Sequence, residues 1–311
     1  MKVTYSAPAK IILSGEHAVV YGKPALIASV DLRLTITVFR KMVIQRDATI
    51  KMMSDIVLRY LTKNDITHHK KPYGFTITSQ IPAGANLGSS AALSVASTGA
   101  FLHFYTGRIF SKDIINKLAY EVEKYFHGNP SGADNSTSCF GGLIYYQKES
   151  EAVKNITPLH FSIPTAFSKN LFIIDGGKPI ESTKEMVVGI VGNRYKEQPK
   201  KTQIIFNEIE KCTKRMVASL EQNKPQQFKR SIEENERCLE SLGVVSEQTK
   251  IFLKQLRQFG VGKVTGAGGR KCGSGNILFF ANDSAGLMKY LQRQNLVYIK
   301  FIKDDGGVLA I

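Results

Sequence analysis

A loop of small residues between a predicted strand and a predicted helix constrains this chain more than any other stretch. Residues 73–78 alternate like a strand, and residues 93–104 place apolar side chains at helical spacing. The loop and the start of the helix comprise Pro82, Ala83, Gly84, Ala85, Asn86, Leu87, Gly88, Ser89, Ser90, Ala91 and Ala92. Glycines here let several backbone N–H groups converge on one anion beside a helix N-terminus. The stretch therefore predicts a phosphate-binding loop, although an ordinary glycine turn with a serine cap explains it equally well.

The N-terminal stretch carries a lysine inside an apolar run. Residues 3–14 read as an extended strand, and Lys10 would be costly to bury there without a partner. We expect Lys10 to face a site that holds negative charge, with a lysine at a strand edge as the alternative. The strand leads into Gly-Glu-His-Ala-Val-Val-Tyr-Gly at residues 15–22, where His17 could also be a hydrogen-bonded turn residue.

Candidate carboxylates lie in the middle of the N-terminal half. Ser111 can cap a helix over residues 112–127. Glu121 and Glu123 fall at opposite rims of the apolar face of this helix, so periodicity does not choose between them. Asp134 follows in an Asn-Pro-Ser-Gly-Ala-Asp segment, where a side-chain-capped turn is the alternative to a functional role.

Length and composition allow one large or two medium domains, because the chain has 311 residues of which 43% are hydrophobic. The polar stretch at residues 148–169 is interrupted by two prolines and is the best candidate for a boundary. We therefore predict an N-terminal domain over residues 1–165 and a C-terminal domain over residues 166–311.

Charge and cysteine content exclude several classes of protein. The net charge is +16, but the lysines are mixed with glutamates on predicted helix faces, which indicates a solvated surface rather than a nucleic-acid site. The four cysteines are scattered and read as reduced thiols without a structural metal. No apolar run is long enough to span a membrane and no signal peptide is recognised, so we expect a cytoplasmic protein.

Three motifs, in order along the chain, resemble a known family. Residues 82–92 resemble the Pro-x-Gly-x-Gly-Leu-Gly-Ser-Ser-Ala-Ala loop of the kinases that act on galactose, homoserine, mevalonate and phosphomevalonate, with Asn86 in place of a glycine. Asparagine tolerates left-handed backbone, so we expect the loop to keep its shape. Residues 10–22 (Lys-x-x-Leu-x-Gly-Glu-His-Ala-Val-Val-Tyr-Gly) and 127–134 (His-Gly-x-Pro-Ser-Gly-x-Asp) resemble mevalonate kinases in particular.

A glycine turn near the C-terminal end resembles a further motif, which the family carries in its second domain, but departs from it. Residues 263–269 read Lys-Val-Thr-Gly-Ala-Gly-Gly, after which family members usually continue with further glycines and a cysteine before a strand. Here residues 270–276 intervene, and they include Arg270 and Lys271. We interpret these two cations as solvated on a longer loop, with contact to a phosphate as the alternative.

The resemblance implies a two-domain α+β fold, with an N-terminal ribosomal-protein-S5-like domain and a C-terminal ferredoxin-like domain. It also implies ATP-dependent phosphorylation of the primary hydroxyl of mevalonate, a step of isoprenoid biosynthesis. Kinases of phosphomevalonate or homoserine and an inactive nucleotide-binding regulator are the alternatives. The expected partners are the small-molecule acceptor, ATP with Mg²⁺ and, as an option, a second copy of the chain in a homodimer.

The resemblance also implies a role for individual residues. Asp134 would accept the hydroxyl proton, Lys10 would stabilise the developing alkoxide, and residues 82–92 would bind the phosphates of ATP. Ser90 and Glu123 would bind Mg²⁺, which chooses Glu123 over Glu121. The residues expected near the acceptor are Glu16, His17, Thr183, Gly266 and Ala267.

Overall fold

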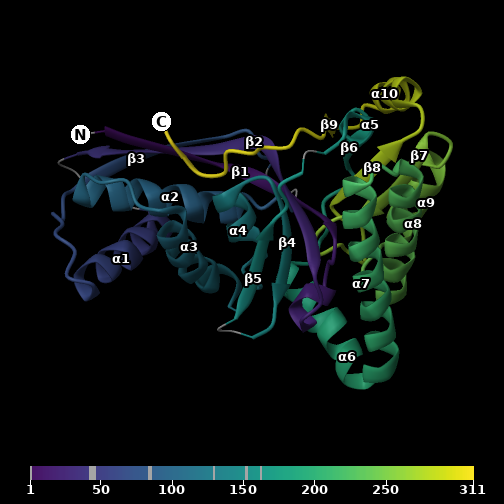
Figure 1. Ribbon diagram of the computed structural model, residues 1–311, viewed down its shortest axis with the longest axis horizontal. Helices are drawn as coiled ribbons and strands as arrows, with labels where there is room; N and C mark the ends of the chain where they lie inside the picture. Colours follow the sequence, from purple (N-terminus) through teal and green to yellow (C-terminus); the bar gives the residue numbers. More distant parts are fainter. Residues whose placement is uncertain (1, 42–46, 83–85, 129, 151–152, 162) are drawn as a thin grey trace.

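The computed structural model describes residues 2–41, 47–82, 86–128, 130–150, 153–161 and 163–311. Two antiparallel sheets lie side by side, and helices pack on each of them (Figure 1). This arrangement confirms the α+β class that the family resemblance implied. The boundary near residue 165 stays a prediction.

The first sheet has the strand order β10-β1-β2-β4-β5, and β3 also pairs with β2. The chain's last strand therefore returns to the sheet formed by its first residues, and both ends of the chain lie at the same side in Figure 1. The strands are β1 (Lys2–Ser14), β2 (Ala25–Arg40), β3 (Tyr73–Ser79), β4 (Leu143–Lys148), β5 (Lys154–Pro158) and β10 (Leu309–Ala310).

Helix α2 is the central helix of the first half. It contacts β1 and β2 on one side and α1, α3 and α4 on the others, so nearly all of its faces are buried. Its small residues suit this position because they let several elements approach closely. The helices here are η1 (Ala18–Tyr21), α1 (Ala48–Lys63), α2 (Ser89–Thr106), α3 (Lys112–His127) and α4 (Ala133–Phe140).

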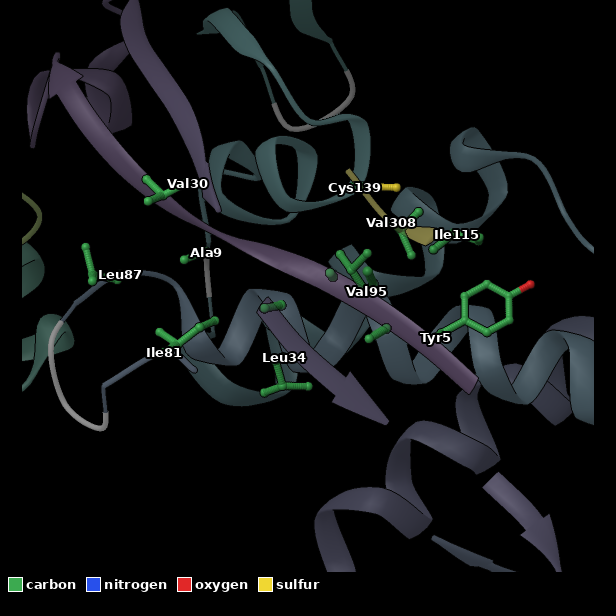
Figure 2. Packing of buried hydrophobic residues seen from close by; sticks show 14 of the residues in the cluster. Tyr5, Ala9, Val30, Leu34, Ile81, Leu87, Val95, Ile115, Cys139 and Val308 are labelled. Atoms are coloured by element: carbon green, nitrogen blue, oxygen red, sulfur yellow. The ribbon is translucent and has the colours of Figure 1, made fainter. Parts of the chain in front are cut away.

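The main core lies between β1 and α2. Alternate residues of β1, among them Tyr5 and Ala9, point into this core, as the period of two in a strand requires (Figure 2). Val95 of α2 packs on the same side of the sheet (Figure 2). The two elements approach so closely at Gly99 that a methyl group built there would lie 2.6 Å from the ring of Tyr5.

The second sheet has the strand order β7-β8-β6-β9, in which the first strand along the chain, β6, is central. This is the order of a ferredoxin-like sheet, as the resemblance implied. Its strands are β6 (Leu171–Asp175), β7 (Gly260–Val264), β8 (Asn276–Ala281) and β9 (Tyr298–Lys300). The helices of this half are α5 (Thr165–Ser168), η2 (Glu185–Gly192), α6 (Asn193–Glu197), α7 (Pro199–Glu221), α8 (Pro225–Leu242), α9 (Glu247–Leu256) and α10 (Ser284–Arg293).

The sequence did not predict every strand, and β5 is one that it missed. The polar stretch at residues 148–169 contains β5, which pairs with β4 at the edge of the first sheet. An edge strand has one neighbour and a solvated side, so polar residues and a terminal proline, Pro158, are tolerated there. Its sequence therefore lacks the apolar alternation by which strands such as β1 and β3 were recognised.

We predict that Gly99→Ala destabilises the protein. Alanine in a helix interior is favoured over glycine by about 1 kcal/mol, but overpacking against a buried ring costs about 1–3 kcal/mol. The expected net loss is on the order of 1 kcal/mol in the free energy of unfolding, measured by urea denaturation. Gly189→Ala is the control, because no described atom lies within 4 Å of the added methyl group. Equal stability changes in the two variants would contradict this account of the α2–β1 contact.

Candidate active site

A cavity of about 330 Å³ lies where the two halves of the molecule meet. Most residues singled out from the sequence line it: Lys10, Glu16, His17, Pro82, Asn86, Leu87, Gly88, Ser89, Ser90, Glu123, Asp134, Thr183, Gly266 and Ala267. Ala91 and Ala92 are instead buried within α2 and do not belong to the described lining. Ala83, Gly84 and Ala85 lie outside the described residues.

The predicted order of strand, loop and helix is confirmed for the described residues around the phosphate loop, by which we mean Pro82 and residues 86–90. Asn86 has φ 56° and Gly88 has φ 76°, so both adopt left-handed backbone, as the sequence led us to expect for Asn86. Helix α2 begins at Ser89. Ser89 and Ser90 line the cavity, so the unpaired backbone N–H groups at the N-terminus of α2 lie beside it. An anion is favoured at this end of a helix.

The phosphate loop packs directly on Lys10. The backbone N–H of Lys10 donates to the carbonyl of Leu87 at 2.9 Å. A methyl group built on Gly88 would lie 2.8 Å from Cγ of Lys10, so the position needs glycine for its lack of a side chain as well as its backbone. Lys10 thus passes beneath the loop that precedes α2.

Lys10 and Asp134 form an ion pair at the cavity. Their Nζ and Oδ1 atoms are 3.1 Å apart; the lysine side chain is 4% exposed and the aspartate side chain 39% exposed. The buried lysine is therefore held by a carboxylate that can still reach a bound molecule. A cation and a proton acceptor side by side are the groups that transfer of a phosphoryl group to an alcohol requires.

Asp134 lies in the first turn of α4, which was not predicted as a helix. The segment Ala-Asp-Asn-Ser-Thr-Ser-Cys-Phe has low helix propensity, so its sequence indicates turn chemistry. In the structure α4 packs against α2 and α3, and this burial stabilises a helix that propensity alone does not favour. Gly132 occupies the N-cap position with φ 91°, and Asp134, two residues later, pairs with Lys10.

Glu123 is buried in a small polar cluster beside the N-terminus of α2. Ser94 donates a hydrogen bond to Glu123 Oε1 at 2.7 Å, and His127 Nε2 lies 3.6 Å from Oε2. The same His127 nitrogen lies 3.3 Å from the hydroxyl of Ser90. The pKa of Glu123 is raised to about 7, chiefly by burial and to a smaller extent by the charge of Asp134, while the hydrogen bond from Ser94 and the charge of Lys10 oppose the rise.

The chemistry of this cluster fits Mg²⁺. Ser90 and Glu123 supply hard oxygen ligands on either side of one imidazole, and a buried carboxylate with a raised pKa gains from a cation. No group of three or more histidine, cysteine or acidic side chains in the described ranges is arranged to hold a metal. Mg²⁺ usually takes one or two protein ligands and completes its shell with substrate phosphates and water, and Ser90 and Glu123 could supply that number.

Glu16 and His17 are buried where η1 meets the second half. Glu16 pairs with Lys263, and both side chains are 0% exposed. Burial raises the pKa of Glu16, while the charge of Lys263 opposes that shift. Nε2 of His17 lies 3.1 Å from the carbonyl of Ala267, and burial lowers the pKa of His17 to about 4, so the imidazole is neutral near pH 7.

Arg270 and Lys271 are exposed, and neither lines the cavity as described. Their backbone N–H groups instead point at the carboxylate of Glu181, at 3.4 and 3.1 Å. The geometry thus favours the interpretation of both cations as solvated.

Several lining residues were not assigned from the sequence. Lys184, His127 and the valines of η1 and η2 line the cavity, and Ser94, which is not among the lining residues, completes the cluster around Glu123. The spacing of four residues between Glu123 and His127 on α3 places them on one helix face, so that pair could have been recognised.

No described helix is long and apolar enough to cross a membrane.

Comparison with known proteins gives consistent matches. Residues 49–142 match the family model described as GHMP kinases N terminal domain. The mevalonate kinase of Thermococcus sibiricus is 33% identical over 306 residues, with 88% of each chain covered. The mevalonate kinase of Pyrococcus furiosus is 32% identical over 311 residues with the same coverage.

Solved structures share the fold. The L. major mevalonate kinase in complex with R-mevalonate superposes with a TM-score of 0.76 at 19% identity, covering 95% of both chains. The Streptococcus pneumoniae phosphomevalonate kinase in complex with phosphomevalonate and AMPPNP has a TM-score of 0.76 at 18% identity, covering 96% of this chain and 99% of that one.

We predict that Glu236→Gln raises stability at alkaline pH. Glu236 of α8 accepts a hydrogen bond from the Val264 N–H, and burial raises its pKa to about 7 from 4.5. The folded state therefore binds the proton of the Glu236 carboxyl more tightly than the unfolded state does. The contribution of this group to the free energy of unfolding is complete below about pH 4.5 and is lost as the pH rises through about 7. At pH 8.5 the free energy of unfolding of the variant should be higher than that of the wild type by about 3 kcal/mol at most, and this difference should narrow toward pH 5.

The measurement is urea denaturation across this pH range, with Glu233→Gln as the control because Glu233 is exposed on the same helix. A gap between Glu236→Gln and the wild type that does not change with pH would contradict the prediction.

Proposed function

Because this chain belongs to the mevalonate kinases of the GHMP kinase family, we propose that it transfers the γ-phosphoryl group of ATP to the primary hydroxyl of mevalonate. The products are 5-phosphomevalonate and ADP, which places the reaction in the mevalonate pathway of isoprenoid biosynthesis. The observation that carries the proposal is the 3.1 Å contact between Lys10 and Asp134 beside the phosphate loop.

In this mechanism the protein mainly positions the reactants. Phosphoryl transfer has a loose transition state, so alignment of the alcohol and neutralisation of phosphate charge supply most of the acceleration. N–H groups at the start of α2 bind the phosphates, and Asp134 orients the hydroxyl. An alcohol is too weak an acid for a carboxylate to deprotonate in advance, so its proton passes to Asp134 late, while Lys10 stabilises the developing negative charge on oxygen.

Ser90 and Glu123 would hold Mg²⁺. When bound, the ion would neutralise charge on the β- and γ-phosphates and fix their orientation. Ser94 and His127 orient Glu123 for this role through the contacts described above. Glu16, His17, Thr183, Gly266 and Ala267 form the part of the cavity that we assign to the acceptor.

We also propose that the chain divides near residue 165 and acts in the cytoplasm, with a homodimer as one possible assembly. The boundary is supported by the separate sheets on either side of α5. The return of β10 to the first sheet means that the two parts are also joined at the C-terminal end.

An ADP-release assay with mevalonate, phosphomevalonate, homoserine and galactose tests the substrate. We expect mevalonate to give a kcat/KM at least about a hundredfold above the others, because a site that binds polar groups of one acceptor leaves them unpaired with another. A preference for phosphomevalonate or homoserine would replace the proposed acceptor, and no ADP release with any alcohol would favour a nucleotide-binding regulator.

Asp134→Asn tests the proton acceptor. The amide keeps the shape of the side chain but cannot take a proton, so kcat should fall by at least about a hundredfold. ATP binding, measured by calorimetry, should survive. Asp31→Asn, at an exposed position of β2, is the control and should retain wild-type turnover. Turnover near the wild-type value in Asp134→Asn would rule out the assigned role.

Glu123→Gln tests the metal ligand. Because an amide oxygen binds Mg²⁺ more weakly than a carboxylate, the Mg²⁺ concentration for half-maximal activity should rise by about tenfold or more. Glu121→Gln is the matched control, since Glu121 is exposed and pairs with Lys124. An equal Mg²⁺ requirement in both variants would remove Glu123 from the metal site.

A further inference from the structure

Two departures from the family's motifs meet in the folded chain. Asn86 stands where the loop of the resembling family has a glycine, and residues 270–275 lengthen the glycine turn that precedes β8. A methyl group built on Gly275 would lie 2.9 Å from Nδ2 of Asn86, and one built on Gly266 would lie 3.3 Å from its Cβ. The Asn86 side chain therefore lies against two glycines that leave room for it.

The glycine turn forms a firm support for this side chain. The N–H of Gly275 donates to the carbonyl of Gly177 at 2.9 Å, and the N–H of Gly176 donates to the carbonyl of Gly275 at 3.0 Å. Ser274 donates a further hydrogen bond to the carbonyl of Gly269 at 3.1 Å. The position of Gly275 is thus fixed by the segment that follows β6, so the turn cannot shift freely when Asn86 presses on it.

Asn86 also lies directly before the part of the loop that contacts the catalytic lysine. Its neighbour Leu87 accepts the hydrogen bond from the N–H of Lys10, and Gly88 packs on the Lys10 side chain. A displacement of Asn86 therefore changes where the following amides lie relative to Lys10. The contact with the second half thus determines the position of the phosphate loop relative to β1.

We propose that Asn86 is a positioning residue that docks the phosphate loop on the glycine turn around Gly266 and Gly275 and so fixes the loop for ATP. The asparagine supplies two properties together: it accepts the left-handed backbone at φ 56°, and its side chain fills a space that glycine would leave open. The inference rests on the proposed function in one respect, namely that the anion bound by the loop is the triphosphate of ATP.

Asn86→Gly tests the docking contact, because glycine keeps the left-handed backbone and removes the side chain. We expect the dissociation constant for MgATP, measured by calorimetry without acceptor, to rise by about tenfold, in the range of couplings between residues in contact. The KM for ATP should rise in parallel while the KM for the acceptor stays within about twofold. Unchanged MgATP affinity in Asn86→Gly would overturn the proposal.

Gly275→Ala tests the same contact by changing the glycine in place of Asn86. Its methyl group would collide with Asn86, but alanine at φ 82° is also strained by itself. Gly243→Ala measures that strain alone, since Gly243 has φ 78° and no described atom lies within 4 Å of its added methyl group. We expect Gly275→Ala to weaken MgATP binding by about tenfold and Gly243→Ala to leave it unchanged.

The double variant Asn86→Gly/Gly275→Ala separates docking from a general structural effect. If the two residues act through their contact, Gly275→Ala should weaken MgATP binding no further once the Asn86 side chain is gone. Losses that multiply in the double variant would contradict a direct contact.

Failure of this inference is distinguishable from failure of the proposed function. A wild-type protein that binds MgATP but does not phosphorylate mevalonate would refute the acceptor and leave the Asn86 test intact. Normal mevalonate kinase activity with equal MgATP affinity in the wild type and Asn86→Gly would refute the inference and leave the function intact.

Discussion

A buried ion pair between Glu16 and Lys263 joins the two halves of this protein, and the cavity depends on it. Both side chains are fully buried, so each charge needs the other to offset its lost hydration. Such a pair contributes little net stability over an apolar contact, but it tolerates little misalignment. Hydrogen bonds from Ser14 to Asn235 and from Thr265 to the carbonyl of Ile12 flank the pair and hold β1 against the second half.

Strand β1 connects the Glu16–Lys263 contact between the two halves to Lys10 in the candidate active site. One of its faces packs on α2, which fixes the strand, and the same strand places Lys10 beneath the phosphate loop. Directly after its end come Glu16 and His17, which face the second half. A single rigid element therefore sets the distance between the predicted phosphate site and the predicted acceptor site, as a reaction catalysed by positioning requires.

The cavity is bordered by residues in unusual backbone conformations. His17, Asn86 and Gly88 all have positive φ, and each is held by contacts from elsewhere in the chain. Non-glycine residues persist in such conformations where the surrounding structure determines them. For the two non-glycine residues those contacts come from the second half, because Ala267 holds His17 and the turn around Gly275 holds Asn86, whereas Gly88 packs on Lys10 of β1.

The sequence by itself determined the motifs and the longer elements: the loop that opens α2 and the lysine of β1 at the candidate site are confirmed in the structure. These two features follow from local periodicity, glycine placement and motif spacing. The ferredoxin-like strand order of the second sheet is also confirmed, but it was implied by the family resemblance alone. Tertiary structure alone decided that Asp134 lies in the first turn of a helix, that Ser90 meets the pair of His127 and Glu123, that Glu16 is paired with Lys263, and that Asn86 meets Gly275. Each of these is a contact between segments distant in the sequence or a helix stabilised by packing, and local pattern does not encode which partner a distant segment supplies.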